Sequence, residues 1–191
     1  MWNFQSRFQG HTDVPLDETG ASQAERAARM LAALSPEALI SSDLRRASET
    51  AQPLSAMVGV PVTLDAGLRE RNMGAWEGLS RDEVEERFPG EWAARQPAGG
   101  ETFEEVADRV VAVVEGALEK VSSGGTLVVV THGASARACI ARLLQLPVPL
   151  WSGIGPLGNC AWSILGEGHA GWRLLEHNAG TLPEPVLSDD R

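Results

Sequence analysis

Apolar residues recur along the chain at helical intervals in some segments and at strand-like intervals in others. Between residues 20 and 34, alanines and leucines recur every three or four positions with charged side chains between them, which predicts an amphipathic helix. An apolar strand is predicted at residues 39–41, followed by a helix over residues 43–58 with Ser42 as its N-cap and a kink at Pro53. The first part of the chain therefore has the predicted order helix, strand, helix.

The middle of the chain continues this alternation. Residues 61–65 alternate as a strand does, and capping-box patterns begin at Ser80 and Thr102, the second at the start of a long helix with one apolar face. Residues 126–131 (TLVVVT) are rich in β-branched side chains, which predicts a strand buried on both faces. Residues 134–146 return to helical spacing, so a strand, a tight turn and a helix follow one another.

The last part of the chain contains two short apolar runs. Residues 160–165 and 172–176 flank the segment GEGHAG and predict a hairpin. Residues 89–100 are predicted to be irregular, and residues 182–191 to be a flexible tail. Strands that alternate with helices predict an α/β layered fold, and the length predicts a single domain over residues 1–191.

Composition and charge exclude several classes of partner. The chain has 26 Asp and Glu against 16 Lys and Arg, and its net charge of −10 repels nucleic acid and anionic lipid alike. We therefore expect no nucleic-acid partner and no membrane partner. Residues 1–10 contain no apolar signal-peptide core, and Cys139 and Cys160 lack the spacing of a zinc site. These features predict a cytoplasmic protein without a bound metal.

Polar side chains cluster where predicted strands end, which is where open α/β sheets bind ligands. Arg45 and Arg46 follow the first strand, where they either hold an anion with the help of the helix N-terminus or are simply solvated. Glu70, with Arg69 and Arg71 on either side, follows the strand at residues 61–65. This glutamate is either a positioned acid or a partner in a surface ion pair.

A third cluster follows the β-branched strand. His132 stands directly before a predicted helix whose N-terminus lies behind Gly133, so its imidazole either binds an anion, acts as an acid or base, or caps the turn. Earlier in the chain, His11 and Asp13 have ligand-like spacing, but a single His-x-Asp pair is weak evidence for a metal site.

Five ordered segments of this chain closely resemble the histidine phosphatase superfamily, which has the phosphoglycerate mutase-like fold. The resemblance extends over nearly the whole chain. It implies a three-layer α/β sandwich, with a mostly parallel sheet and helices on both faces. The matching segments are residues 2–20 (including WN and RFQGHTDVPLDETG), 41–51 (SSDLRRASETA), 68–79 (LRERNMGAWEGL), 128–138 (VVVTHGASARA) and 158–163 (GNCAWS).

The resemblance implies roles for individual residues. Arg46 corresponds to a phosphate-binding arginine and Glu70 to the proton donor, while His132 is the late histidine of the site. Asn3 and Gln9 correspond to side chains that approach the phosphate. These roles suit phosphoryl transfer, which needs cations around the phosphoryl oxygens and a proton for the leaving alkoxide.

The element that defines the family is missing from this sequence. Relatives carry an Arg-His-Gly triplet at the end of a first strand, shortly before Trp-Asn, and its histidine is the nucleophile; here only Met1 precedes Trp2. Without that histidine we expect the chain as given to be inactive. We also expect strands next to the missing one to have unpaired backbone groups. The favoured interpretation is a truncated or mis-started phosphatase. The alternative is an inactive phosphate-binding protein, in which Arg46, His132, Asn3 and the amides of the helix N-terminus behind Gly133 form a cationic pocket for the anion.

The length of one segment indicates which branch of the family this chain resembles. Mutases have a longer insert than the stretch between Gly78 and Thr102 allows, which favours the small phosphatases, with mutase activity as a further alternative. The implied substrate is a small phosphorylated metabolite, and the implied reaction uses no metal or organic cofactor. The sequence leaves the oligomeric state open.

Overall fold

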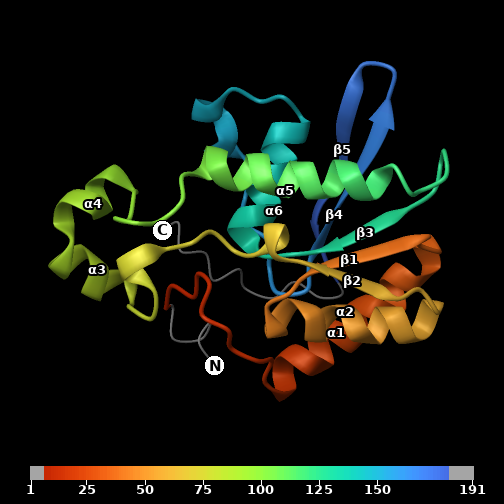
Figure 1. Cartoon of the computed structure of the whole chain (residues 1–191), viewed down its shortest axis with the longest axis horizontal. Helices are drawn as coiled ribbons and strands as arrows, with labels where there is room; N and C mark the ends of the chain where they lie inside the picture. The colour runs from red at the N-terminus through yellow and green to blue at the C-terminus, as the bar shows by residue number, and fades with distance from the viewer. Residues whose placement is uncertain (1–6, 181–191) are drawn as a thin grey trace.

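The computed structural model describes residues 7–180, and its centre is a three-stranded parallel sheet (Figure 1). The central strand β1 (Ala38–Ser42) pairs on one side with β2 (Val62–Asp65) and on the other with β3 (Leu127–Val130). In register, Ser41 of β1 lies opposite both Leu64 and Val130. Four of the five β1 residues are buried, which makes β1 the most buried strand of the sheet.

Helices cover both faces of this sheet, as Figure 1 shows. On one side α1 (Glu18–Leu31) packs against α2 (Arg45–Val58), and on the other side α5 (Phe103–Leu118) packs against α6 (Gly133–Leu143). The larger hydrophobic core lies between the sheet and the α5–α6 pair. The predicted three-layer α/β fold is therefore confirmed.

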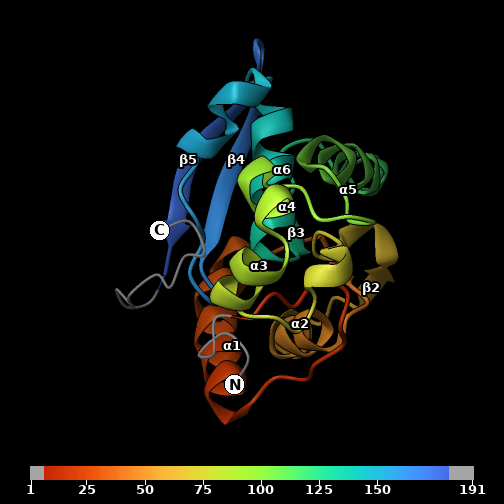
Figure 2. The same ribbon diagram turned by 90° about the vertical axis from the view of Figure 1, so that its left-hand side faces the viewer.

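Two short helices and a β-hairpin lie outside the three-layer core. Two short helices, α3 (Arg81–Arg87) and α4 (Pro89–Ala94), lie at one end of the molecule and come to the front in Figure 2. The strands β4 (Trp162–Gly168) and β5 (Gly171–Ala179) form the predicted antiparallel hairpin. No helix of the described residues is long and apolar enough to cross a membrane.

The sequence predicted helix ends correctly where the two residues that form the capping hydrogen bonds lie close together in the chain. The two predicted capping boxes are present: the hydroxyls of Ser80 and Thr102 accept the amides of residues three positions later. Gly59, with φ of 72°, ends α2 in the left-handed conformation that glycine tolerates. The predicted single domain stays a prediction, and the predicted tail at residues 182–191 lies outside the described residues.

Several predicted details were wrong. Ser42 is the last residue of β1 and not a helix N-cap, because α2 begins later and the amide of Arg45 donates instead to Asp13 (2.7 Å). Residues 89–100 are not entirely irregular, since Pro89 occupies the first turn of α4, where proline's fixed φ suits a helix. The strand β3 is not buried on both faces: only Val128 is buried.

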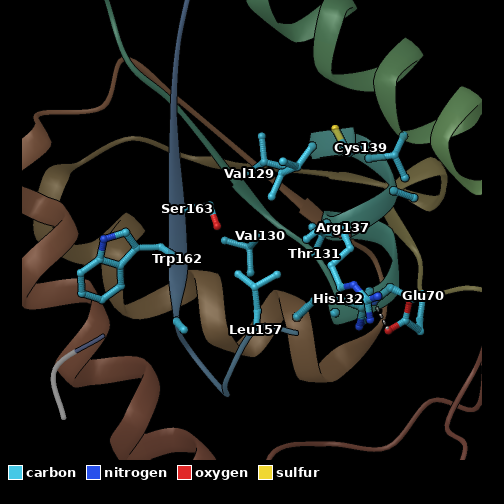
Figure 3. Close-up of a pocket in the computed structure, with 18 of the residues that line it drawn as sticks. Glu70, Val129, Val130, Thr131, His132, Arg137, Cys139, Leu157, Trp162 and Ser163 are labelled. Atoms are coloured by element: carbon cyan, nitrogen blue, oxygen red, sulfur yellow. Dashed lines mark hydrogen bonds between the residues drawn. The ribbon is translucent and has the colours of Figure 1, made fainter. Parts of the chain in front are cut away.

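The partial exposure of β3 has a visible cause. Within residues 7–180, no strand pairs with the edge of β3 that faces away from β1. That edge lines part of an open groove of about 2690 Å³, which extends as far as α1 and α4 and is also lined by β4 (Figure 3). In the close-up, Val129 and Val130 lie on the β3 side of this groove, and Ser163 lies on β4. The parallel sheet and the hairpin are thus separate sheets.

The open edge gives a first prediction. Backbone amides on a strand alternate in direction, so every second N–H of β3 points into the groove, while those of the central strand β1 point to a neighbouring strand. We expect amide hydrogen exchange, measured by NMR, to be fast at alternate positions of β3 and slow throughout β1. Uniform protection of β3 would contradict an open edge and would show that another segment pairs with it.

Candidate active site

The carboxyl ends of β1 and β3 lie side by side, and a helix begins behind each of them. Arg46 lies in the first turn of α2, and His132 is the residue between β3 and α6. Because the two strands are parallel neighbours, the chain brings these two side chains together from positions 86 residues apart. Glu70, which follows β2, reaches the same corner (Figure 3).

Arg46 connects three segments through its guanidinium group. Its Nη1 donates to the carbonyl of Thr12 (2.8 Å) and its Nη2 to the carbonyl of Gly10 (2.9 Å), while Nε donates to Nδ1 of His132 (3.2 Å). Burial lowers the pKa of Arg46, and the carboxylate of Glu70 partly opposes that shift. The group remains a cation that is only partly exposed to solvent.

The hydrogen bonds of His132 define its protonation state. A guanidinium N–H can only donate, so Nδ1, which accepts from Arg46, carries no proton. The other ring nitrogen, Nε2, lies 2.9 Å from Oγ of Ser42 and donates to it. Burial lowers the pKa of His132 to about 4, with Arg46 adding to the effect against an opposing contribution from Glu70. The imidazole is therefore neutral near pH 7.

Glu70 is held against the N-terminus of α6. Its carboxylate accepts the backbone amides of Arg71 (2.8 Å), Ala134 (3.2 Å) and Ser135 (3.2 Å). A helix N-terminus stabilises negative charge, which explains why a carboxylate occupies this position. The helix that begins at Gly133 was predicted to offer its amides to an anion. In the structure, two of these amides bind the protein's own carboxylate.

The loop before α1 lies over Arg46. Gln9 of this loop lines the same pocket, and Asn3 lies outside the described residues. Glu77 anchors the loop, since its carboxylate accepts from the amide of His11 (2.9 Å) and the hydroxyl of Thr12 (3.1 Å). At Gly10, with φ of 51°, a Cβ atom would overlap the side chain of Glu77, and this left-handed conformation itself favours glycine.

The possible metal pair, His11 and Asp13, is used in other ways. Nε2 of His11 lies 2.9 Å from the carbonyl of Glu70, and Asp13 accepts the first amide of α2, that of Arg45. In the part of the chain that the structure describes, no group of three His, Cys, Asp or Glu side chains is arranged to hold a metal ion.

The sequence-based reasoning found three of the residues at this corner and missed the roles of three others. Arg46, Glu70 and His132 were predicted as site residues, and the structure brings them together. These residues are Ser42, which contacts a ring nitrogen of His132, and Glu77 and Arg109, which bind backbone groups of the neighbouring loops. Of these, only Ser42 and Glu77 lie inside a segment used for the resemblance.

The fold and this corner together define an α/β protein in which an arginine, a histidine and a carboxylate converge at the carboxyl edge of a parallel sheet. The family description that matches residues 1–180 is "Histidine phosphatase superfamily (branch 1)". The chain belongs to the histidine phosphatase superfamily.

Known proteins similar to this chain include phosphatases. It is 38% identical over 183 residues to the glucosyl-3-phosphoglycerate phosphatase of Mycolicibacterium vanbaalenii, an alignment that covers 88% of this chain and 80% of the relative. The corresponding Mycobacterium tuberculosis enzyme is 39% identical over 184 residues, covering 88% and 81%. A solved mycobacterial glucosyl-3-phosphoglycerate phosphatase with VO3 superimposes with a TM-score of 0.88 at 36% identity, covering 94% of each chain. Family and relatives together support a phosphatase.

The buried histidine gives a prediction on pH and stability. The folded pKa of about 4 lies below the ordinary 6.5, so between these values the unfolded chain takes up a proton that the folded chain refuses. The free energy of unfolding should therefore fall as the pH drops from 6.5 to 4, with a contribution from His132 on the order of 2–3 kcal/mol. Urea denaturation across this range measures it.

The matched control is His132→Gln, which keeps a polar side chain but cannot titrate. Asp43 and Glu101 also lose stabilisation as the pH falls, because hydrogen bonds to arginines hold their pKa values low, but they do so in both proteins. We expect the variant to show a shallower decline than the wild type. Parallel curves would mean that His132 is not held neutral.

Proposed function

We propose that this protein is a phosphomonoester phosphatase acting on a small phosphorylated sugar, of which glucosyl-3-phosphoglycerate is the first candidate. The observation that carries the proposal is the convergence of Arg46, His132 and Glu70 at one sheet edge, in a chain 38–39% identical to glucosyl-3-phosphoglycerate phosphatases. Mutase activity has less support, because the relatives from Mycolicibacterium vanbaalenii and Mycobacterium tuberculosis are both named phosphatases.

Each of the three residues has a role that fits its environment. Arg46, a partly buried cation, stabilises negative charge on the phosphoryl oxygens more strongly than a fully solvated arginine would. His132 contributes a hydrogen bond to the same oxygens through its Nε2–H, once the contact of that group with Ser42 opens. Glu70, positioned by three backbone amides, first takes up a proton from solvent and then passes it to the departing alkoxide as the P–O bond breaks.

The phosphohistidine route of the family also needs a nucleophile. That histidine attacks phosphorus, forms an N–P bond and expels the alkoxide, and water later cleaves the N–P bond. The Arg-His-Gly triplet that supplies it in relatives does not occur among the 191 residues. Of the histidines in this sequence, His132 is poorly suited to attack because both of its ring nitrogens are already hydrogen-bonded.

This last observation favours a second candidate function, phosphate binding without turnover. Arg46 and the α6 corner would then hold a phosphate ester that no group attacks. Two measurements on the 191-residue chain separate the candidates: phosphate release from glucosyl-3-phosphoglycerate, and calorimetric titration with orthophosphate. Turnover that disappears in Arg46→Ala supports the phosphatase. Binding without turnover supports the second candidate, and the absence of both contradicts both.

The proton-donor role gives a prediction on leaving groups. Glu70→Gln should lower kcat/KM for an alkyl phosphate by about 10²-fold or more, because the alkoxide needs a proton. The loss for p-nitrophenyl phosphate should be much smaller, since nitrophenolate leaves without one. Arg46→Ala should slow both substrates alike, because it acts on the phosphoryl oxygens.

The control is Glu86→Gln, a surface substitution on α3 that should leave both rates unchanged. Equal losses for the two substrates in Glu70→Gln would count against proton donation. They would make Glu70 a structural partner of the α6 amides instead.

A further inference from the structure

The segment that carries Glu70 has its carbonyl groups turned toward α5. We call residues 67–72 the Glu70 loop. Arg109, in the second turn of α5, donates through Nη1 to the carbonyls of Gly67 (2.9 Å) and Arg69 (2.8 Å), and through Nη2 to the carbonyl of Glu70 itself (2.9 Å). One side chain thus binds three of the loop's backbone acceptors.

The remaining N–H groups of Arg109 bind Glu101. Nε donates to one oxygen of this carboxylate (2.7 Å) and Nη2 to the other (2.8 Å). A guanidinium has five N–H groups, so the donor capacity of Arg109 is fully used. The pair is only about one-fifth exposed. Burial opposes ionisation of Glu101, but hydrogen bonds from Arg109 and from the loop outweigh it, and the pKa of Glu101 is lowered.

Glu101 binds the far end of the same loop. Its Oε2, besides accepting from Arg109, accepts the backbone amide of Asn72 (2.8 Å). The arginine and its carboxylate partner together form a brace that meets the loop before, at and after Glu70. On the opposite side, Thr131 donates to the carbonyl of Leu68 (2.8 Å), so the loop is fixed between α5 and the β3–α6 turn.

We propose that Arg109 is a positioning residue for Glu70: the brace that it forms with Glu101 fixes the Glu70 carboxylate at the N-terminus of α6, facing Arg46 and His132. The proposal rests on the proposed function for the role of Glu70 as proton donor. Arg109 makes its contacts to the loop through backbone carbonyls, so we assign it no contact with substrate.

The geometry also predicts that lysine cannot replace this arginine. A lysine ammonium has three donors around one point, whereas Arg109 reaches three carbonyls and two carboxylate oxygens through a planar fork. Arg109→Lys retains the charge beside Glu101 but loses most of the loop contacts. The charge and the fork can therefore be tested separately.

The test begins with a spectroscopic signature of Glu70 placement. The amides of Ala134 and Ser135 donate to the Glu70 carboxylate, so their proton shifts and exchange rates report its position. In Arg109→Gln we expect both signals to move toward their positions in Glu70→Gln. Both amides should exchange at least about tenfold faster, the effect expected for a lost hydrogen bond to a charged group.

Two further variants keep the test decisive if Arg109→Gln does not fold. Arg109→Lys and Glu101→Gln each remove part of the brace and should shift the same two amides in the same direction. The control is Arg142→Gln, which breaks an ion pair with Asp108, the neighbour of Arg109 on α5, and should leave both amides unchanged. Folded variants with wild-type signals at these amides would overturn the proposal.

Kinetics supply the second readout. Arg109→Lys should lower kcat for an alkyl phosphate by about 10-fold to 10²-fold, with a smaller loss for p-nitrophenyl phosphate and little change in KM, because a misplaced acid affects only the step that needs its proton. Equal losses for both substrates would contradict positioning of the acid. If the wild type turns over neither substrate, the proposed function fails, and the amide signals still decide whether Arg109 positions Glu70.

Discussion

The partly buried guanidinium of Arg46 holds the site together. Arg46 extends from α2, donates to two carbonyls of the loop before α1, and donates to His132 beyond β3. Removing a cation from water costs several kcal/mol unless polar partners replace the solvent, so the surrounding segments must present their acceptors to it. The conformation of the loop, the unprotonated Nδ1 of the histidine and the nearby Glu70 carboxylate all meet this requirement.

Arg109 plays a similar part on the other side of the site, where it binds backbone groups of a loop. The loop that carries Glu70 is irregular, and its carbonyls have no strand partner. Arg109 binds three of them from a regular helix. Two arginines on regular helices therefore hold the two loops of the site in place. Arg46 on α2 binds the loop before α1, and Arg109 on α5 binds the Glu70 loop, each through several N–H groups of a planar guanidinium. Of these two cations, Arg109 contributes to the precision of the site without an assigned contact to the substrate.

The contacts that the sequence predicted join residues close together in the chain, whereas the contacts that it missed join residues far apart. Capping boxes at Ser80 and Thr102 were correct because both partners lie within one helical turn. The helix cap at Ser42 was wrong because Asp13, 32 residues away, supplies the acceptor for Arg45. The family resemblance placed Arg46, Glu70 and His132 at one site, but no periodicity or spacing signals an arginine that binds distant carbonyls. Arg109 therefore emerged only from the three-dimensional contacts.

The groove between β3 and β4 separates the parallel sheet from the β4–β5 hairpin. In the described region the β4–β5 hairpin shares no hydrogen-bonded ladder with the parallel sheet, and Leu165 and Leu174 attach it to the α5–α6 core by side-chain packing. Side-chain packing is non-directional and tolerates sliding, whereas a ladder fixes register. We therefore expect the hairpin to open locally at a lower free energy than the parallel sheet, with the groove as the boundary between the two.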